Sequence, residues 1–128
     1  MIDHVGFAVT DFNKAKTFYK QALAPLSISL LREFSGADTG GEAHAGFGAD
    51  GKPFFWIGTG KRAATSVHVA FRARSRAEVD AFYKAAIVAG GTDNGEPGVR
   101  EHYHADYYGA FVLDPDGNNI EAVCHRPE

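Results

Sequence analysis

Residues 4–23 read HVGFAVTDFNKAKTFYKQAL, and residues 68–87 read HVAFRARSRAEVDAFYKAAI. The second stretch repeats the first without a gap, and the run Phe18-Tyr19-Lys20 returns as Phe82-Tyr83-Lys84. Each copy starts with alternating apolar residues, which is typical of a half-buried strand, and continues with the apolar period of a helix. The chain is therefore predicted to contain an internal repeat whose copies each open with a strand and a helix.

The rest of each copy reads as three more strands. Asp50-Gly51 and Asp114-Pro115-Asp116-Gly117 combine the residues that tight turns select, so each is expected to join two antiparallel strands. The first half has strands expected near residues 28–34, 43–48 and 54–58 and a loop at 35–42. The second half has a loop at the Gly and Pro residues of 95–98, a strand near 99–104, and then the hairpin at 107–125.

These elements predict an α+β fold in which two tandem βαβββ modules form a curved mixed sheet around a cleft. The modules span about residues 1–60 and 65–128 of a single domain, 1–128. Neither module is expected to stand alone, because a sheet with a helix on one face leaves its other face to be covered.

Composition places the chain among soluble globular proteins, with 45% hydrophobic and 23% charged residues. A net charge of −3 offers no basic surface for nucleic acid, and no apolar run is long enough to cross a membrane. The first residues do not resemble a signal peptide, and the lone Cys124 can form no internal disulfide. We therefore expect a cytoplasmic protein.

Three polar residues on predicted strands are candidate metal ligands. His4 and His68 hold equivalent places in the two copies, on strand faces lined by small residues. Alternation after the last turn puts Glu121 on the face opposite Ile120 and Ala122. A strand carboxylate is usually exposed and a single strand histidine usually structural. The repeat nevertheless favours a site for a divalent ion such as Zn²⁺, Mn²⁺, Fe²⁺ or Ni²⁺.

The doubled pattern, with a strand histidine opening each half and a DPDG turn leading to NNIEAV, resembles the vicinal oxygen chelate superfamily. That superfamily includes glyoxalase I, extradiol dioxygenases, fosfomycin-modifying thiol transferases and bleomycin-binding proteins. The resemblance covers essentially the whole chain and implies paired βαβββ modules around a U-shaped site, usually in a homodimer. It also implies that His4, His68 and Glu121 are metal ligands.

One ligand of the glyoxalase I pattern is missing. That pattern has a fourth ligand, a carboxylate on the last strand of the first half. Aligning Asp50-Gly51 with Asp116-Gly117 puts Phe55 opposite Glu121, with Trp56 as the neighbour if the register shifts. Neither residue is acidic, so glyoxalase I activity is not expected. A set of two histidines and one glutamate is instead the pattern of the dioxygenase and thiol-transferase branches.

Other side chains are candidates for the cleft, each with a plainer alternative. His102 and His104 share a predicted strand face and are candidate acids or bases near neutral pH, or exposed residues of a polar edge strand. The remaining candidates to line the substrate site are Trp56, Phe55, Tyr107 and Arg100. For Trp56 and Phe55 the alternative is packing in the core. His44 and His125 are expected at the surface, and Cys124 in the core.

The sequence therefore predicts a small metal-dependent enzyme of the glyoxalase or dioxygenase type, acting as a lyase, isomerase or dioxygenase on a small molecule. In this interpretation Glu121 is also a catalytic residue. The alternative is a binding protein that sequesters a ligand without catalysis, as bleomycin-binding proteins do. Because those proteins need no protein-bound metal, the complete set of three ligands favours the enzyme.

Overall fold

The computed structural model describes residues 1–128, except the side chain of Thr39, and folds them into two similar halves. The first half contains β1 (Val5–Ala8), α1 (Phe12–Leu23), the 3-10 helix η1 (Ala24–Leu26), β2 (Ser29–Phe34), α2 (Gly36–Thr39), β3 (His44–Ala49) and β4 (Lys52–Gly58). The second half contains β5 (His68–Arg72), α3 (Arg76–Val88), β6 (Thr92–Val99), β7 (Tyr108–Leu113) and β8 (Asn119–Cys124). The predicted tandem βαβββ architecture is confirmed.

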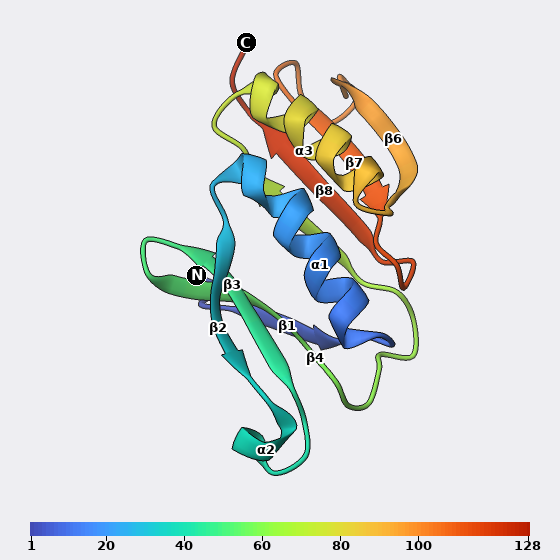
Figure 1. Cartoon of the computed structure of the whole chain (residues 1–128). Helices are drawn as coiled ribbons and strands as arrows, with labels where there is room; N and C mark the ends of the chain where they lie inside the picture. Colours follow the sequence, from blue (N-terminus) through green and yellow to red (C-terminus); the bar gives the residue numbers. More distant parts are fainter.

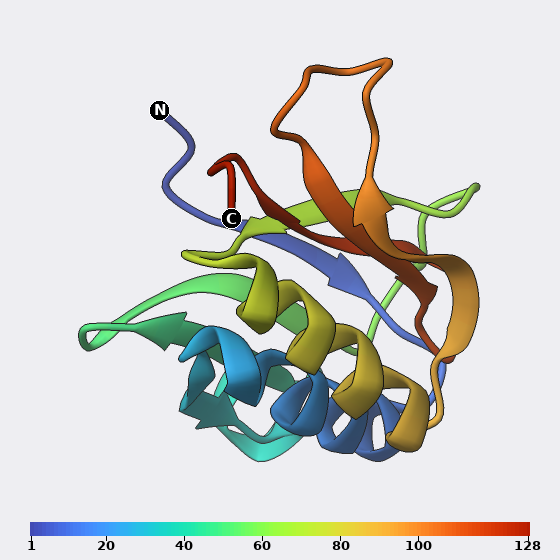
Figure 2. The ribbon, with the colours of Figure 1, turned by 90° about the horizontal axis from the view of Figure 1, so that it is seen from above.

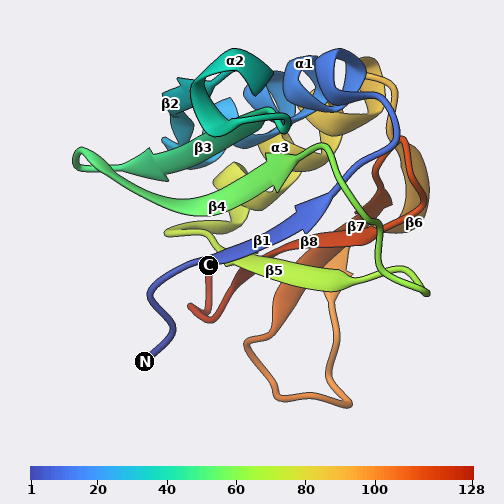
Figure 3. The same cartoon turned by 90° about the horizontal axis from the view of Figure 1, so that it is seen from below.

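Each half forms its own four-stranded mixed sheet. The strand orders are β1-β4-β3-β2 and β5-β8-β7-β6, with β1 parallel to β4 and β5 parallel to β8. The remaining neighbours are antiparallel. Strands β1 and β5 are the facing edges of the two sheets, and they are not hydrogen-bonded to each other within the described chain (Figure 3).

The two long helices begin where the sequence places a capping residue. The Asp11 carboxylate accepts a hydrogen bond from the Lys14 amide at 3.0 Å, and the Ser75 hydroxyl accepts one from the Glu78 amide at 3.2 Å. Helix α1 ends at Leu23, before Pro25. Both predicted helices are therefore confirmed.

Helices α1 and α3 pack against each other and lie on the same side of the two sheets (Figures 1 and 2). Between helices and sheets runs one apolar core that draws on both halves, including Phe18, Phe55, Phe82 and Ile120. The other face of each sheet carries no helix in Figure 2 and holds the alternate side chains of each strand. No helix of the described chain is long and apolar enough for a membrane span.

Two predictions about connecting segments were wrong. The Gly and Pro residues expected in a loop belong to β6, whereas most of the residues expected in the following strand form the connection at 100–107, which projects from the sheet in Figure 2. As an edge strand, β6 tolerates Pro97, because only one side of the strand must hydrogen-bond. The predicted loop at 35–42 contains the four-residue helix α2, which is too short to show an apolar period.

The alignment of the two hairpins also needs correction. Asp50 and Gly51 both have positive φ, 54° and 75°, and join β3 to β4 directly, whereas β7 and β8 are joined by the longer segment 114–118. The turns are therefore not equivalent. In the sheets, Gly6 is opposite Trp56 and the equivalent Ala70 is opposite Glu121. Trp56, rather than Phe55, holds the place of Glu121 in the first half.

Candidate functional site

The uncovered face of the second sheet carries a buried carboxylate with two polar partners. One oxygen of Glu121, Oε1, lies 2.9 Å from Nε2 of His68, and the other, Oε2, accepts a hydrogen bond from the hydroxyl of Tyr107. Glu121 is only 1% exposed, whereas the side chain of His68 is 53% exposed. The carboxylate is thus shielded from solvent, while the imidazole beside it remains open to a ligand.

Strand pairing brings these residues together. Glu121 in β8 stands between Ala70 of β5 and Phe111 of β7 in the sheet register. The small side chain of Ala70 leaves space beside the carboxylate, and His68 lies on the same face of β5, two residues earlier. Tyr107 is the last residue before β7 and reaches the same carboxylate from the connection at 100–107.

The Tyr107 hydroxyl is a hydrogen-bond donor that keeps its proton in this arrangement. Burial raises the pKa of the Tyr107 hydroxyl well above its ordinary value, and the hydrogen bond and negative charge of Glu121 raise it further. The hydroxyl therefore stays protonated at neutral pH and holds Oε2 of Glu121. Only Oε1 remains directed toward His68.

His4 lies apart from this pair in the single chain. Its Nδ1 is 2.7 Å from Asp3, whose pKa is lowered first by the hydrogen bond from His4 and then by Lys52. The His4 side chain is exposed and lines the same cavity, between β1 and β5, as His68. Among the described residues, no group of three His, Cys, Asp or Glu side chains is arranged to hold a metal ion. The single chain brings together two of the three predicted ligands.

The connection at 100–107 contains a cluster of aromatic and histidine rings. The Asp106 amide donates to Nδ1 of His104, so the proton of His104 is on Nε2, which donates to Nδ1 of His125 at 2.9 Å. The ring of Tyr107 contacts both histidines edge-on. The ring of His102 contacts the ring of Tyr103 at a tilt of 45°, and both residues are exposed. His102 and His104 thus lie on a loop near Tyr107, without a described hydrogen bond to Glu121.

The predicted substrate-lining residues fall in different environments. The Arg100 guanidinium donates to the Glu96 carbonyl at 2.7 Å and lies over the ring of Phe111. Phe55 is fully buried and packs edge-on against Tyr19 and Phe71, although it also borders the cavity between β1 and β5. Core packing, the alternative considered for Phe55, therefore describes its main contacts.

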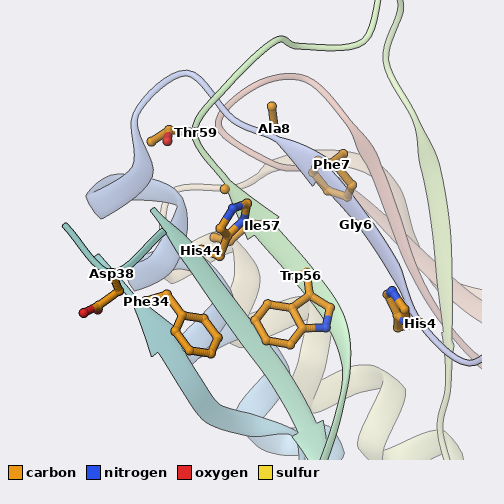
Figure 4. A pocket seen from close by; sticks show the side chains of 11 residues that line it. His4, Gly6, Phe7, Ala8, Phe34, Asp38, His44, Trp56, Ile57 and Thr59 are labelled. Carbon is orange, nitrogen blue, oxygen red and sulfur yellow. The ribbon is translucent and has the colours of Figure 1, made fainter. Parts of the chain in front are cut away.

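Trp56 instead faces a cavity of about 740 Å³ on the uncovered side of the first sheet (Figure 4). Phe34, Asp38, His44 and Thr59 line the same cavity, and His4 lies at its border. Sequence reasoning missed Phe34 and His44 as site residues. The available signal was the glycine-rich strand HAGFGA, since glycines beside a large aromatic residue indicate space above a sheet.

The chain is similar to proteins of one superfamily. Residues 1–122 match the family model of the Glyoxalase/Bleomycin resistance protein/Dioxygenase superfamily. A crystal structure of a glyoxalase/bleomycin resistance protein from Albidiferax ferrireducens is 31% identical, with a TM-score of 0.77 and 98% of each chain covered. Among curated proteins, none matches this chain.

More distant structures share the fold. Glyoxalase I from Zea mays is 22% identical with a TM-score of 0.71, and the match covers 96% of this chain but 45% of the maize protein. The fosfomycin resistance protein FosX from Listeria monocytogenes, solved with Mn(II) and 1S,2S-dihydroxypropylphosphonic acid, is 18% identical with a TM-score of 0.67. That match covers 96% of this chain and 88% of FosX.

Proposed function

Because the chain belongs to the Glyoxalase/Bleomycin resistance protein/Dioxygenase superfamily, we propose that it is a metal-dependent enzyme that acts on an oxygen-bearing small molecule. His68 and Glu121 are two of the metal ligands, and His4 is the third. The observation that carries the proposal is the buried Glu121 carboxylate, held by Tyr107 and directed at the exposed ring of His68.

The donor pair fits two neighbouring positions around a divalent ion. The imidazole nitrogen of His68 and the carboxylate oxygen of Glu121 are 2.9 Å apart, close enough that both would hold the same divalent ion. Mixed nitrogen and oxygen donors suit Zn²⁺, Mn²⁺, Fe²⁺ and Ni²⁺. Because Tyr107 occupies Oε2, Glu121 offers the ion a single oxygen.

The protein's own residues have separate roles in this proposal. His68 and Glu121 hold the ion, and the Tyr107 hydroxyl fixes the carboxylate without releasing its proton. When bound, a divalent ion polarises a carbonyl group or binds two vicinal oxygens of a substrate. Because Tyr107 holds Oε2, Oε1 is the one oxygen of Glu121 that remains, so Glu121 acts as a base only if Oε1 is released from the ion.

Metal content of protein purified without a metal-affinity tag or chelator tests the proposal. Wild-type protein is expected to carry metal that His68→Ala and Glu121→Gln both lose. His125→Ala removes another exposed histidine of the same half and is expected to keep the metal. Folded wild-type protein that takes up no added Zn²⁺, Mn²⁺, Fe²⁺ or Ni²⁺ would contradict the proposal, and ligand binding by that protein would favour the sequestering alternative.

We further propose that the third ligand comes from a second copy of the chain in a homodimer. In the part of the chain that the structure describes, the facing edges β1 and β5 have no strand partner on that side. Val5 and Ile2 are exposed there, and His4 is turned toward Asp3. An unpaired apolar strand edge is a common site of association. A second copy therefore has a surface to bind and a missing ligand to supply.

Mixing variants distinguishes a shared site from a site within one chain. Co-expressed His4→Ala and His68→Ala chains form heterodimers in which one shared site is intact, so about one site in four regains metal on random pairing. Neither variant regains metal when expressed alone. A monomer by light scattering, or no recovery from verified heterodimers, would argue against the shared site.

A further inference from the structure

The floor of the cavity over the first sheet is aromatic. Trp56 of β4 and Phe34 of β2 present rings whose planes differ by 15° and whose centroids are 6.2 Å apart. Both residues are partly exposed and line the cavity of about 740 Å³ shown in Figure 4. Two nearly parallel rings from different strands therefore make one continuous apolar surface.

The indole ring of Trp56 lies flat on the sheet. A Cβ atom added to Gly46 would lie 2.7, 2.8 and 2.8 Å from Cη2, Cζ2 and Cζ3 of the indole. Three nearly equal distances to atoms of one ring mean that the Gly46 backbone lies under the face of that ring rather than at its edge. One face of the indole is thus pressed on Gly46, and the opposite face is turned toward the cavity.

Comparison of the two halves shows that this space is specific to the first. Trp56 and Glu121 hold the same register position, and so do Gly46 and Phe111. The second half has a carboxylate flanked by a large side chain, where the first half has an indole flanked by a glycine. The repeated position that binds the proposed ion in one half provides an open aromatic face in the other.

Polar groups around the floor favour a ligand with oxygen acceptors. His44 lines the cavity, and its ring makes no hydrogen bond to a described residue, while the Asp38 carboxylate is engaged by Ser35. The indole nitrogen of Trp56 is on the side toward His4 in Figure 4. His4 lines both this cavity and the one that contains His68. The indole N–H side of this cavity therefore leads toward His4, one of the proposed metal ligands.

We infer that this cavity binds a flat conjugated ring that carries oxygen acceptors and stacks on the free face of Trp56. The idea that this ring is the part of a substrate that the protein recognises rests on the proposed function, whereas the stacking on Trp56 does not. An aromatic face favours a flat conjugated ring over a saturated ring of similar size by its geometry and quadrupole. The rings of Trp56 and Phe34 therefore select a flat ligand. His44 and the indole N–H select oxygen acceptors on that ligand.

Two matched probes test the inference. Naphthalene-2-carboxylate is flat, and decahydronaphthalene-2-carboxylate has the same skeleton without a π system. Trp56 is the only tryptophan in the chain, so one indole N–H resonance in a proton–nitrogen NMR spectrum reports on this site. The flat acid is expected to bind about tenfold more tightly and to shift that resonance by its ring current. Equal affinities, or binding that leaves the indole resonance unchanged, would overturn the inference.

Variants separate this inference from the metal proposal. Trp56→Leu and Phe34→Leu are expected to reduce the preference for the flat acid, and Trp56→Phe to keep part of it. His68→Ala is expected to lose metal but to keep the preference for the flat acid over the saturated one. If wild-type protein binds no metal but still prefers the flat acid, the proposed enzyme fails and the stacking site stands. If a folded Trp56→Leu protein keeps the full preference, the stacking site fails whatever the metal content.

Discussion

At the scale of single residues, Tyr107 contributes a hydrogen bond that a buried charge needs. Replacing Tyr107 by Phe removes the donor from Oε2 of Glu121, which is 1% exposed. A buried carboxylate oxygen without its donor is expected to destabilise the protein by about 1–3 kcal/mol. Urea unfolding measures the change. Tyr103→Phe is the matched control, because Tyr103 contacts the Tyr107 ring but is 58% exposed. Equal stability of the two variants would mean that Glu121 does not depend on Tyr107.

Trp56 also leads to a prediction about glyoxalase I activity. The resemblance to glyoxalase I requires a carboxylate at the first-half equivalent of Glu121, and the sheet register puts Trp56 there. An indole neither binds a divalent ion nor moves a proton between carbons. We therefore expect no conversion of methylglyoxal and glutathione to lactoylglutathione by the metal-loaded protein. Efficient conversion in that assay would show that the missing carboxylate is dispensable.

At the scale of elements, the turn between β7 and β8 connects the two halves. The Asp114 carboxylate is buried and accepts hydrogen bonds from the Tyr19 hydroxyl at 2.5 Å and from the amides of Asp116 and Asn118. The Asn118 side chain in turn accepts from the amide of Val67, just before β5. Helix α1 of the first half is thus joined to a turn of the second.

Tyr19→Phe tests this connection. The variant leaves Asp114 without one donor, so we expect a loss of about 1–3 kcal/mol in the free energy of unfolding, measured in urea. The repeat supplies the control: Tyr83 is the equivalent of Tyr19, but its hydroxyl bonds Asp93 in an exposed contact. Tyr83→Phe is expected to change stability little. Similar losses in both variants would argue against a special role for the buried contact.

The same contact predicts how stability depends on alkaline pH. Burial, followed by the charge of Asp114, raises the pKa of Tyr19 well above its ordinary value. A raised folded-state pKa contributes stability below the unfolded pKa, and this contribution declines as pH rises above about 10. Stability measured from about pH 9 to about pH 11 should therefore decline in the wild-type protein. The decline should be smaller in Tyr19→Phe, and an identical pH dependence would contradict the assignment.

The elements that sequence predicted well are those with a local signal. Capping residues and apolar periods correctly predicted both long helices, because those signals act within a few residues. Strand β6 was missed because Gly95, Pro97 and Gly98 resemble a loop, and only an edge position with register shifts accommodates them. Local chemistry cannot reveal which strand will be an edge.

At the scale of the whole molecule, the repeat predicted which residues are equivalent but not how far apart the halves hold them. The equivalent positions of His4 and His68, together with the strand position of Glu121, predicted that these three residues bind one metal ion. The pair His68 and Glu121 meets within one sheet, where strand pairing fixes the distance. His4 directly precedes β1 of the other sheet, and β1 and β5 do not pair in the described chain. The contact of Tyr107 with Glu121 was also unpredicted, because a loop carries no period.

The shared core makes a final prediction about the whole molecule. Residues of both halves form one apolar cluster, and α1 packs on α3 where each helix would otherwise be exposed. Because neither half has its own closed core, we expect both to unfold in one cooperative transition. Fluorescence of Trp56, which reports only on the first half, and far-UV circular dichroism, which reports on both, should give the same urea midpoint. The fragment 65–128 should show no cooperative transition, since α3 loses its partner helix. Separate midpoints, or a cooperatively folding fragment, would mean that the halves are independent domains and that α1 and α3 do not stabilise each other.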